Sequence, residues 1–146
     1  MKRKLALVLA IVLVIALLTS CKPLFDRNIT LGEMTVKVPR EFVLDELQST
    51  EGFRIYEQDG YAKCIVLTEA ETMFTAQEYI TAMLDMEAQS EIGKLGDMEC
   101  VYSTYEVDSR PCEEVLFILG EKTYSVALRS GDEGEFDELI GTIKVK

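Results

Sequence analysis

The chain has 146 residues, of which 15 are basic, 26 are acidic and none is histidine, and its formal net charge is −11. An acidic surface repels phosphate backbones and anionic lipid headgroups, which argues against nucleic-acid binding and against membrane docking through basic side chains. The lack of histidine removes the commonest general base, the usual partner of a serine or cysteine nucleophile, and the commonest zinc ligand. The composition therefore disfavours most hydrolase mechanisms.

The first 20 residues have the three parts of an export signal. A basic start at 2–4 is followed by 14 apolar residues at 5–18 and by the small pair Thr19 and Ser20. A membrane-spanning helix needs about 20 apolar residues to cross roughly 30 Å of hydrocarbon, so this run is too short for a comfortable permanent anchor. The sequence predicts a signal peptide at 1–20 and export of the remainder.

Leu18, Thr19, Ser20 and Cys21 close this segment and resemble the lipobox of bacterial lipoproteins. The resemblance implies that a dedicated signal peptidase recognises the first three residues and cuts before Cys21, whose thiol carries a diacylglyceryl group. Two acyl chains hold a protein stably, since each buried methylene contributes about 0.8 kcal/mol. The alternative is a plain secreted protein in which Cys21 is incidental. Lipidation would make membrane lipid a partner and place the protein on the extracytoplasmic face of the cell membrane.

Residues 21–28 are expected to form a short tether, and 29–146 have the length of one domain. Three of the 15 basic residues would leave with the signal, so 12 would remain against 26 acidic ones, a side-chain charge of −14. We interpret this charge mainly as a feature that keeps an exported domain soluble.

The domain opens with an expected hairpin. Residues 29–31 and 34–38 alternate apolar and polar side chains around Gly32 and Glu33, and Pro39 stops the second strand.

A second hairpin is predicted from 53–58 and 61–67. The Asp-Gly pair at 59–60 favours a two-residue type I′ turn, which needs positive φ at both positions. In this register Tyr56 faces Lys63.

Two helices are predicted in the second half of the domain. Thr75 and Glu78 form a capping box, and apolar residues at helical spacing continue to Ala88, with Gly93 as the stop. A shorter helix is expected at 132–140, with acidic residues in its first turn, where the macrodipole favours them. The remaining strands, three of which form a meander, are predicted at 98–107, 112–119, 122–129 and 142–145. The elements indicate an α+β fold, with an antiparallel sheet of about six strands covered by helices.

This order of elements is similar to that of the PsbP-like domains. The resemblance is carried by the Val-x-Val-Pro close of the first hairpin at 36–39, the Thr-x-x-Glu helix start at 75–78, and the Phe-x-x-Leu-Ile helix at 136–140. It implies an antiparallel sheet between helices over 29–145, a fold shared with an extrinsic photosystem II subunit and with small lipoproteins of Gram-positive gut bacteria. It implies no activity, and the binding residues of photosynthetic members have no recognisable counterparts.

Acidic residues are the main candidates for chemistry. A carboxylate pair for glycosidic hydrolysis or a calcium site could be drawn from Glu69, Glu71, Asp132, Glu133, Glu135, Asp137 and Glu138. Spacing singles out no pair, and the stretch 132–136 lacks the alternating ligands of an EF-hand loop. The sequence therefore predicts no catalytic, cofactor-binding or metal-ligating residue.

Five tyrosines fall on predicted strands: Tyr56, Tyr61, Tyr102, Tyr105 and Tyr124. They could form a stacking platform for a glycan or peptide, although tyrosine is also an ordinary strand residue and tryptophan, the most effective stacking residue, is absent. A ligand surface on the sheet is thus one open interpretation.

Three cysteines remain beside the expected lipidation site: Cys64, Cys100 and Cys112. Three thiols cannot all pair, and the hairpin expected around 108–111 separates Cys100 from Cys112 by too much for a bond. We expect all three to be reduced, buried and unreactive.

Together these features favour a membrane-anchored extracytoplasmic lipoprotein that acts as a binding or accessory module for an unidentified protein or cell-envelope ligand. The alternative is a small cell-wall or glycan hydrolase, which needs two carboxylates facing each other across a cleft.

Overall fold

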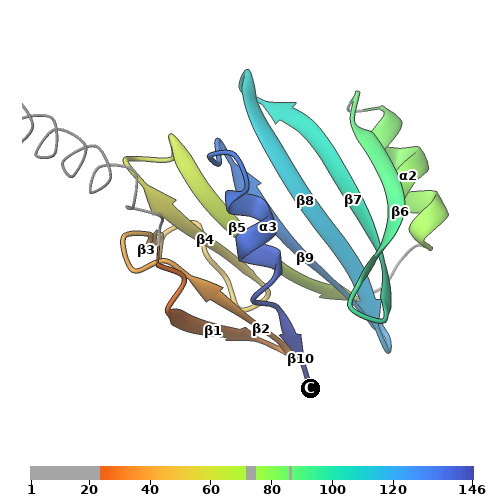
Figure 1. Ribbon diagram of the computed structural model, residues 1–146, viewed down its shortest axis with the longest axis horizontal. Coiled ribbons are helices and arrows are strands. Elements are labelled where there is room, and N and C mark those ends of the chain that lie inside the picture. The colour runs from red at the N-terminus through yellow and green to blue at the C-terminus, as the bar shows by residue number, and fades with distance from the viewer. Residues whose placement is uncertain (1–23, 72–74, 86) are drawn as a thin grey trace, which may run out of the picture.

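The computed structural model describes residues 24–71, 75–85 and 87–146, and this part of the chain forms two antiparallel sheets and two helices (Figure 1). The strands are β1 (Arg27–Leu31), β2 (Met34–Val38), β3 (Val43–Leu44), β4 (Phe53–Gln58), β5 (Lys63–Glu71), β6 (Gln89–Leu95), β7 (Met98–Val107), β8 (Arg110–Leu119), β9 (Lys122–Arg129) and β10 (Lys144–Val145). The helices are α2 (Ala76–Leu84) and α3 (Glu135–Ile140). The predicted α+β class is confirmed, but the described strands form a seven-stranded sheet, β3-β4-β5-β9-β8-β7-β6, and a separate sheet of three, β1-β2-β10.

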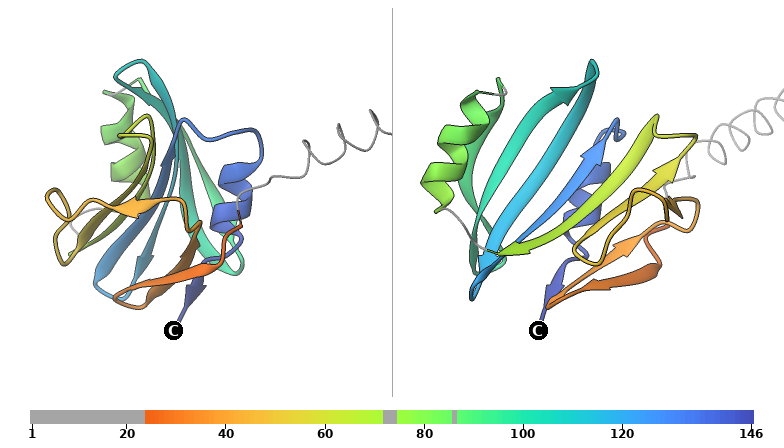
Figure 2. Two further views of the ribbon diagram at one scale, coloured as in Figure 1. Left: turned by 90° about the vertical axis from the view of Figure 1, so that its left-hand side faces the viewer. Right: turned by 180° about the vertical axis from the view of Figure 1, so that it is seen from behind.

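The two helices lie on opposite faces of the seven-stranded sheet, as the turned view in Figure 2 shows. The face toward α3, here called the core face, also packs against the small sheet. Strand β2 shows why, since Met34, Val36 and Val38 alternate with half-buried polar residues and are fully buried in the same cluster as Phe136 and Leu139 of α3. On the other face, here called the open face, α2 lies at the end formed by β6 and β7.

The first hairpin is confirmed, and its turn docks on the large sheet. Gly32 has φ of +55°, and a Cβ there would overlap Glu69 Oε2 and lie 2.6 Å from the Tyr124 hydroxyl. The next residue, Glu33, donates its backbone N–H to that hydroxyl at 3.2 Å. The position therefore requires glycine both for its backbone conformation and for the close approach.

The second hairpin is confirmed, but the predicted register is wrong by two residues. Tyr56 pairs with Ile65 instead of Lys63, because the connecting loop has four residues rather than two. Tyr61 takes a positive φ of 63°, and its carbonyl accepts a 3.0 Å hydrogen bond from Arg110 Nη1. A contact with a distant strand therefore holds the longer loop.

The capping box is confirmed, but the helix is shorter than predicted. The Glu78 N–H donates to Thr75 Oγ1 at 3.3 Å, and the Thr75 N–H donates to Glu78 Oε2 at 2.7 Å. Helix α2 ends at Leu84, and part of the expected tail is instead the edge strand β6. Gly93 lies within β6, where a Cβ would approach the Tyr102 ring to 2.8 Å, so it permits close packing and stops no helix.

The meander of β7, β8 and β9 is confirmed, again with a register shift. Its first turn lies at 108–109, so Cys112 pairs with Tyr105, and Cys100 pairs with Phe117. Helix α3 begins at 135, later than expected, after an N-cap glycine with φ of 78°. No helix in the described part of the chain is long and apolar enough to cross a membrane.

Candidate functional site

The expected lipidation site lies outside the described residues. This holds for Cys21 and for the expected peptidase recognition residues Leu18, Thr19 and Ser20. Their roles stay predictions.

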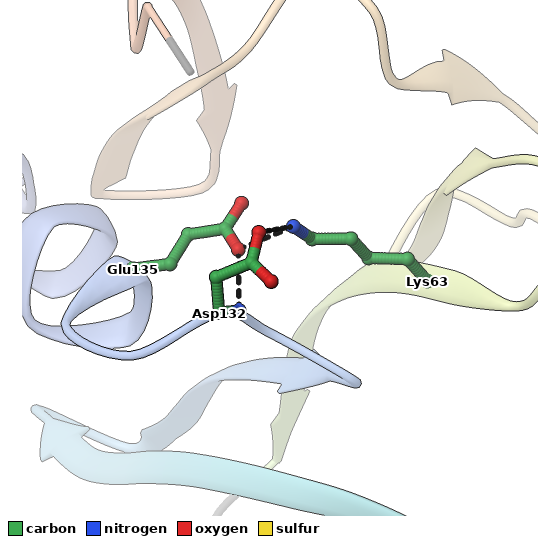
Figure 3. A network of polar contacts seen from close by, with 3 residues as sticks. All are labelled: Lys63, Asp132 and Glu135. Atoms are coloured by element: carbon green, nitrogen blue, oxygen red, sulfur yellow. Dashed lines mark hydrogen bonds and ion pairs between the residues drawn. The ribbon is translucent and has the colours of Figure 1, made fainter. Parts of the chain in front are cut away.

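The acidic segment before α3 closes around a lysine. Lys63 Nζ lies 3.1 Å from Asp132 Oδ2 and forms a second ion pair with Glu135, whose side chain is only 3% exposed (Figure 3). Burial alone would lower the pKa of Lys63, but hydrogen bonds and charge from Glu135 and Asp132 outweigh it and raise the pKa. These two carboxylates therefore tie α3 to β5 and do not face an open cleft.

The other candidate carboxylates are not brought together. Glu69 pairs with Lys122, while Glu71, Glu133 and Asp137 are exposed. Within 24–71, 75–85 and 87–146, no group of three or more Cys, Asp or Glu residues is arranged to hold a metal ion.

The five tyrosines do not share one surface, so the expected stacking platform made of all five is wrong. Tyr56 and Tyr124 are 3% and 1% exposed in the core, and Tyr61 lies in a loop. Tyr102 belongs to the core face by its pairing register. Tyr105 is the one of the five that lines the open face.

The open face carries a groove whose walls include Tyr79 of α2 and Phe53 of β4. Figure 2 shows this face of the sheet from behind. Two adjoining hollows of about 230 Å³ and 280 Å³ share Thr68, Glu114 and Ser125 in their walls. Small side chains along β5 and β9 leave this space, since bulky ones would fill it. We call it the open-face groove.

Glu114 lies at the middle of the groove and is held by two phenols. The Tyr79 hydroxyl from α2 and the Tyr105 hydroxyl from β7 donate to Glu114 Oε2 at 3.0 Å and 3.1 Å. Burial, followed by the negative charge of Glu114, raises the pKa of both tyrosines far above the usual range. Both phenols therefore stay protonated donors and fix one carboxylate oxygen.

Arg129 lies at one end of the groove. It stands between Cys64 and Cys112 in the pairing register, and it forms no ion pair with any residue that the structure describes. Its Nε is buried without a hydrogen-bond partner. Burial raises the pKa of both thiols, and the guanidinium offsets only part of that rise.

Sequence reasoning missed Glu114 and Arg129 as site residues. Each stands on a strand as one polar residue among many, and only the register shows that they share the open face. The alternation of Thr123, Ser125 and Ala127 in β9 was a usable signal, because small and polar side chains on one face of a central strand indicate incomplete covering.

Comparisons with known proteins concern the fold. No protein-family model matches the sequence, and no curated protein matches it significantly. The solution structure of cyanobacterial PsbP (CyanoP) from Synechocystis sp. PCC 6803 is similar, with a TM-score of 0.59, 12% identity, and coverage of 82% of this chain and 91% of that one. A crystal structure from Bacteroides thetaiotaomicron VPI-5482 is similar with a TM-score of 0.56 at 14% identity; the match covers 84% of this chain but 49% of that chain, so this chain spans about half its length. The described domain has a PsbP-like fold.

Proposed function

We propose that this protein is an extracytoplasmic lipoprotein, anchored through acylated Cys21, whose PsbP-like domain acts as a binding or accessory module. The observation that carries the binding role is the open-face groove. It combines a fixed carboxylate, apolar walls and a guanidinium that forms no ion pair with the described residues. Pockets with a few placed polar groups in an apolar lining are typical ligand sites.

The anchor would hold the groove close to the membrane. Strand β1 begins at Arg27, six residues after Cys21, and six extended residues span at most about 22 Å. A partner would therefore be a component of the cell envelope or a solute that passes near the lipid surface.

The geometry does not favour the hydrolase alternative. Glu114 lines both hollows, and Glu71 is the second carboxylate at the groove. Glu114 and Val66 both pair with Ala127 of β9, and Glu71 is five residues beyond Val66 along β5. The backbone positions of the two glutamates are therefore about 17 Å apart along the strand direction. Glycosidase carboxylates lie about 5–9.5 Å apart.

The anchor is tested by growing cells with labelled fatty acid. The wild-type chain should take up label and partition into detergent. Cys21→Ser should take up no label and leave a precursor that partitions poorly or is retained by its signal segment. A wild-type chain without label would reject the lipoprotein assignment.

The binding role is tested separately by photo-crosslinking in intact cells. A benzoylphenylalanine in place of Phe53, which lines the groove, should give a defined adduct whose mass identifies a protein or an envelope ligand. The control position is Leu84, which is 63% exposed on α2. No adduct at Phe53, or the same adducts from both positions, would contradict a specific binding role.

A further inference from the structure

Arg129 places a positive charge in the groove of an acidic protein and forms no ion pair with any described residue. Although the chain carries 26 acidic residues, none forms an ion pair with Arg129 in the described part of the chain, and Nε of this half-buried side chain is unsatisfied. Glu57 lies in the same row beyond Cys64, but no ion pair joins it to Arg129, and its buried Oε2 has no hydrogen-bond partner among the described residues. A carboxylate fits this position, because guanidinium and carboxylate form charge-assisted, frequently bidentate hydrogen bonds.

Glu114 offers the opposite charge along the same groove. Both tyrosine hydroxyls donate to its Oε2, and no hydrogen bond to Oε1 is present among the described residues. Oε1 is therefore available to accept a hydrogen bond from a ligand. An ammonium group on the ligand would supply both the donor and the positive charge that complements Glu114.

The two charged residues are spaced for a molecule between them. Glu114 pairs with Ala127, so Arg129 is its diagonal neighbour, two residues farther along the adjacent strand. Such neighbours have Cα atoms about 7–8 Å apart, within reach of long side chains, yet no direct ion pair forms between them. The gap suits a compact ligand that carries a carboxylate and an ammonium on neighbouring atoms.

The walls of the hollow define the rest of the ligand. Phe53, Val66 and Ala127 line it together with Arg129 and Glu114, and its volume is about 230 Å³. Drug-sized ligands occupy pockets of about 300–1,000 Å³, so a smaller molecule with an apolar body fits this space.

From these contacts we infer that the open-face groove binds a small zwitterion with the chemistry of a free α-amino acid that has an apolar side chain. Arg129 binds its carboxylate, Glu114 binds its ammonium, and the apolar wall receives its side chain. The inference rests on the proposed binding function and names the ligand class for it.

The test is isothermal titration calorimetry on the full chain, purified in detergent, with L-leucine and two analogues. Leucine should bind saturably at one site per chain. The analogue 4-methylpentanoate lacks the ammonium, and 3-methylbutylamine lacks the carboxylate, so each should bind at least tenfold more weakly. Equal binding of either analogue would overturn the zwitterion assignment, and no saturable heat with leucine or phenylalanine would overturn the proposal.

Substitutions assign the roles of the two charges. Arg129→Gln and Glu114→Gln should each weaken leucine binding at least tenfold, whereas Arg129→Lys should restore part of the affinity. The matched control is Arg40→Gln, since Arg40 is an exposed arginine away from the groove whose side chain is 80% exposed. Thermal melting shows which variants are folded, and unchanged affinity in a folded Arg129→Gln variant would overturn the proposal. A failure here leaves fatty-acid labelling and the Phe53 crosslink intact, so it is distinguishable from failure of the proposed function.

Discussion

The Tyr79 hydroxyl donates a 3.0 Å hydrogen bond to Glu114 Oε2 and so joins helix α2 to strand β8 across the open face. Tyr79→Phe should lower the free energy of unfolding by about 1–2 kcal/mol, because hydrogen bonds to charged groups contribute about 1.5–3 kcal/mol and Tyr105 still satisfies the carboxylate. Urea denaturation measures this change.

The control for that change is Tyr61→Phe. The Tyr61 hydroxyl accepts a hydrogen bond from Gln48 Nε2 at an exposed position. Loss of this hydrogen bond should change the free energy of unfolding by less than about 0.5 kcal/mol. Equal effects of the two substitutions would mean that the hydrogen bond from α2 to β8 contributes no more to stability than an exposed hydrogen bond does.

Lys63 neutralises a buried carboxylate and should be difficult to replace. Lys63→Met leaves Glu135 buried without its counterion, which should lower the free energy of unfolding by about 3–5 kcal/mol. Adding Glu135→Leu should recover most of the loss, because removing both charges avoids the unpaired one. The surface control is Arg40→Met, which breaks an exposed pair with Asp26 and should cost at most about 1 kcal/mol. A double variant as unstable as Lys63→Met would contradict this account.

The same ion pair gives a dependence on alkaline pH. The folded-state pKa of Lys63 is raised above its ordinary value of 10.5, so its contribution to stability is complete below pH 10.5 and is lost as the pH rises through the folded-state value. The difference in unfolding free energy between wild type and Lys63→Met should therefore be constant from pH 7 to 9 and shrink above pH 10.5. A difference that grew above pH 10.5 would have the wrong sign.

Gly32 should tolerate no side chain. Gly32→Ala combines a positive φ with a Cβ that overlaps Glu69 and Tyr124, so it should lower the free energy of unfolding by more than about 2 kcal/mol. The matched control is Gly120→Ala, which has a similar φ of +58° but no atom within 4 Å of the added Cβ, and should cost about 1 kcal/mol. Equal losses in thermal or urea denaturation would show that the docking of the first turn does not matter.

Local signals predicted the elements whose causes are local. The capping box at Thr75 and the glycine turn at Gly32 depend on neighbouring residues, and both were found from the sequence. Strand β6 was missed because its strand conformation depends on pairing with β7 and on the contact of Gly93 with Tyr102. The loop at Tyr61 was predicted too short for a similar reason, since Arg110 from β8 holds it.

The site was less predictable than the fold. Glu114 meets Tyr79 only because α2 packs on the open face, and Arg129 is its diagonal neighbour through the pairing of β8 with β9. A two-residue error in strand pairing keeps the faces of side chains but moves their neighbours along the strand. The sequence alone could therefore indicate a ligand surface on the sheet without naming the residues that form it.

The three described cysteines should be reduced and slow to react. Cys64, Cys100 and Cys112 are 2%, 2% and 5% exposed, and burial raises the pKa of each thiol, which keeps them protonated. Cys64 and Cys112 flank Arg129 from two different strands, so their Cα atoms lie about two strand spacings, or roughly 9.6 Å, apart. A disulfide needs less than about 7 Å, and Cys100 belongs to the opposite face.

A chromogenic thiol reagent measures this directly on the full chain with Cys21→Ser, so that only the three described thiols count. The native chain should react slowly, and the chain unfolded in guanidinium without reductant should release three equivalents. Arg129→Gln should slow the reaction of Cys112 with the reagent further, because the guanidinium partly offsets the rise in the pKa of that thiol caused by burial. The control Arg40→Gln should leave the reaction rate unchanged. One equivalent after unfolding would reveal a disulfide and refute the observed strand register, and fast reaction of the native chain would refute the burial of these side chains.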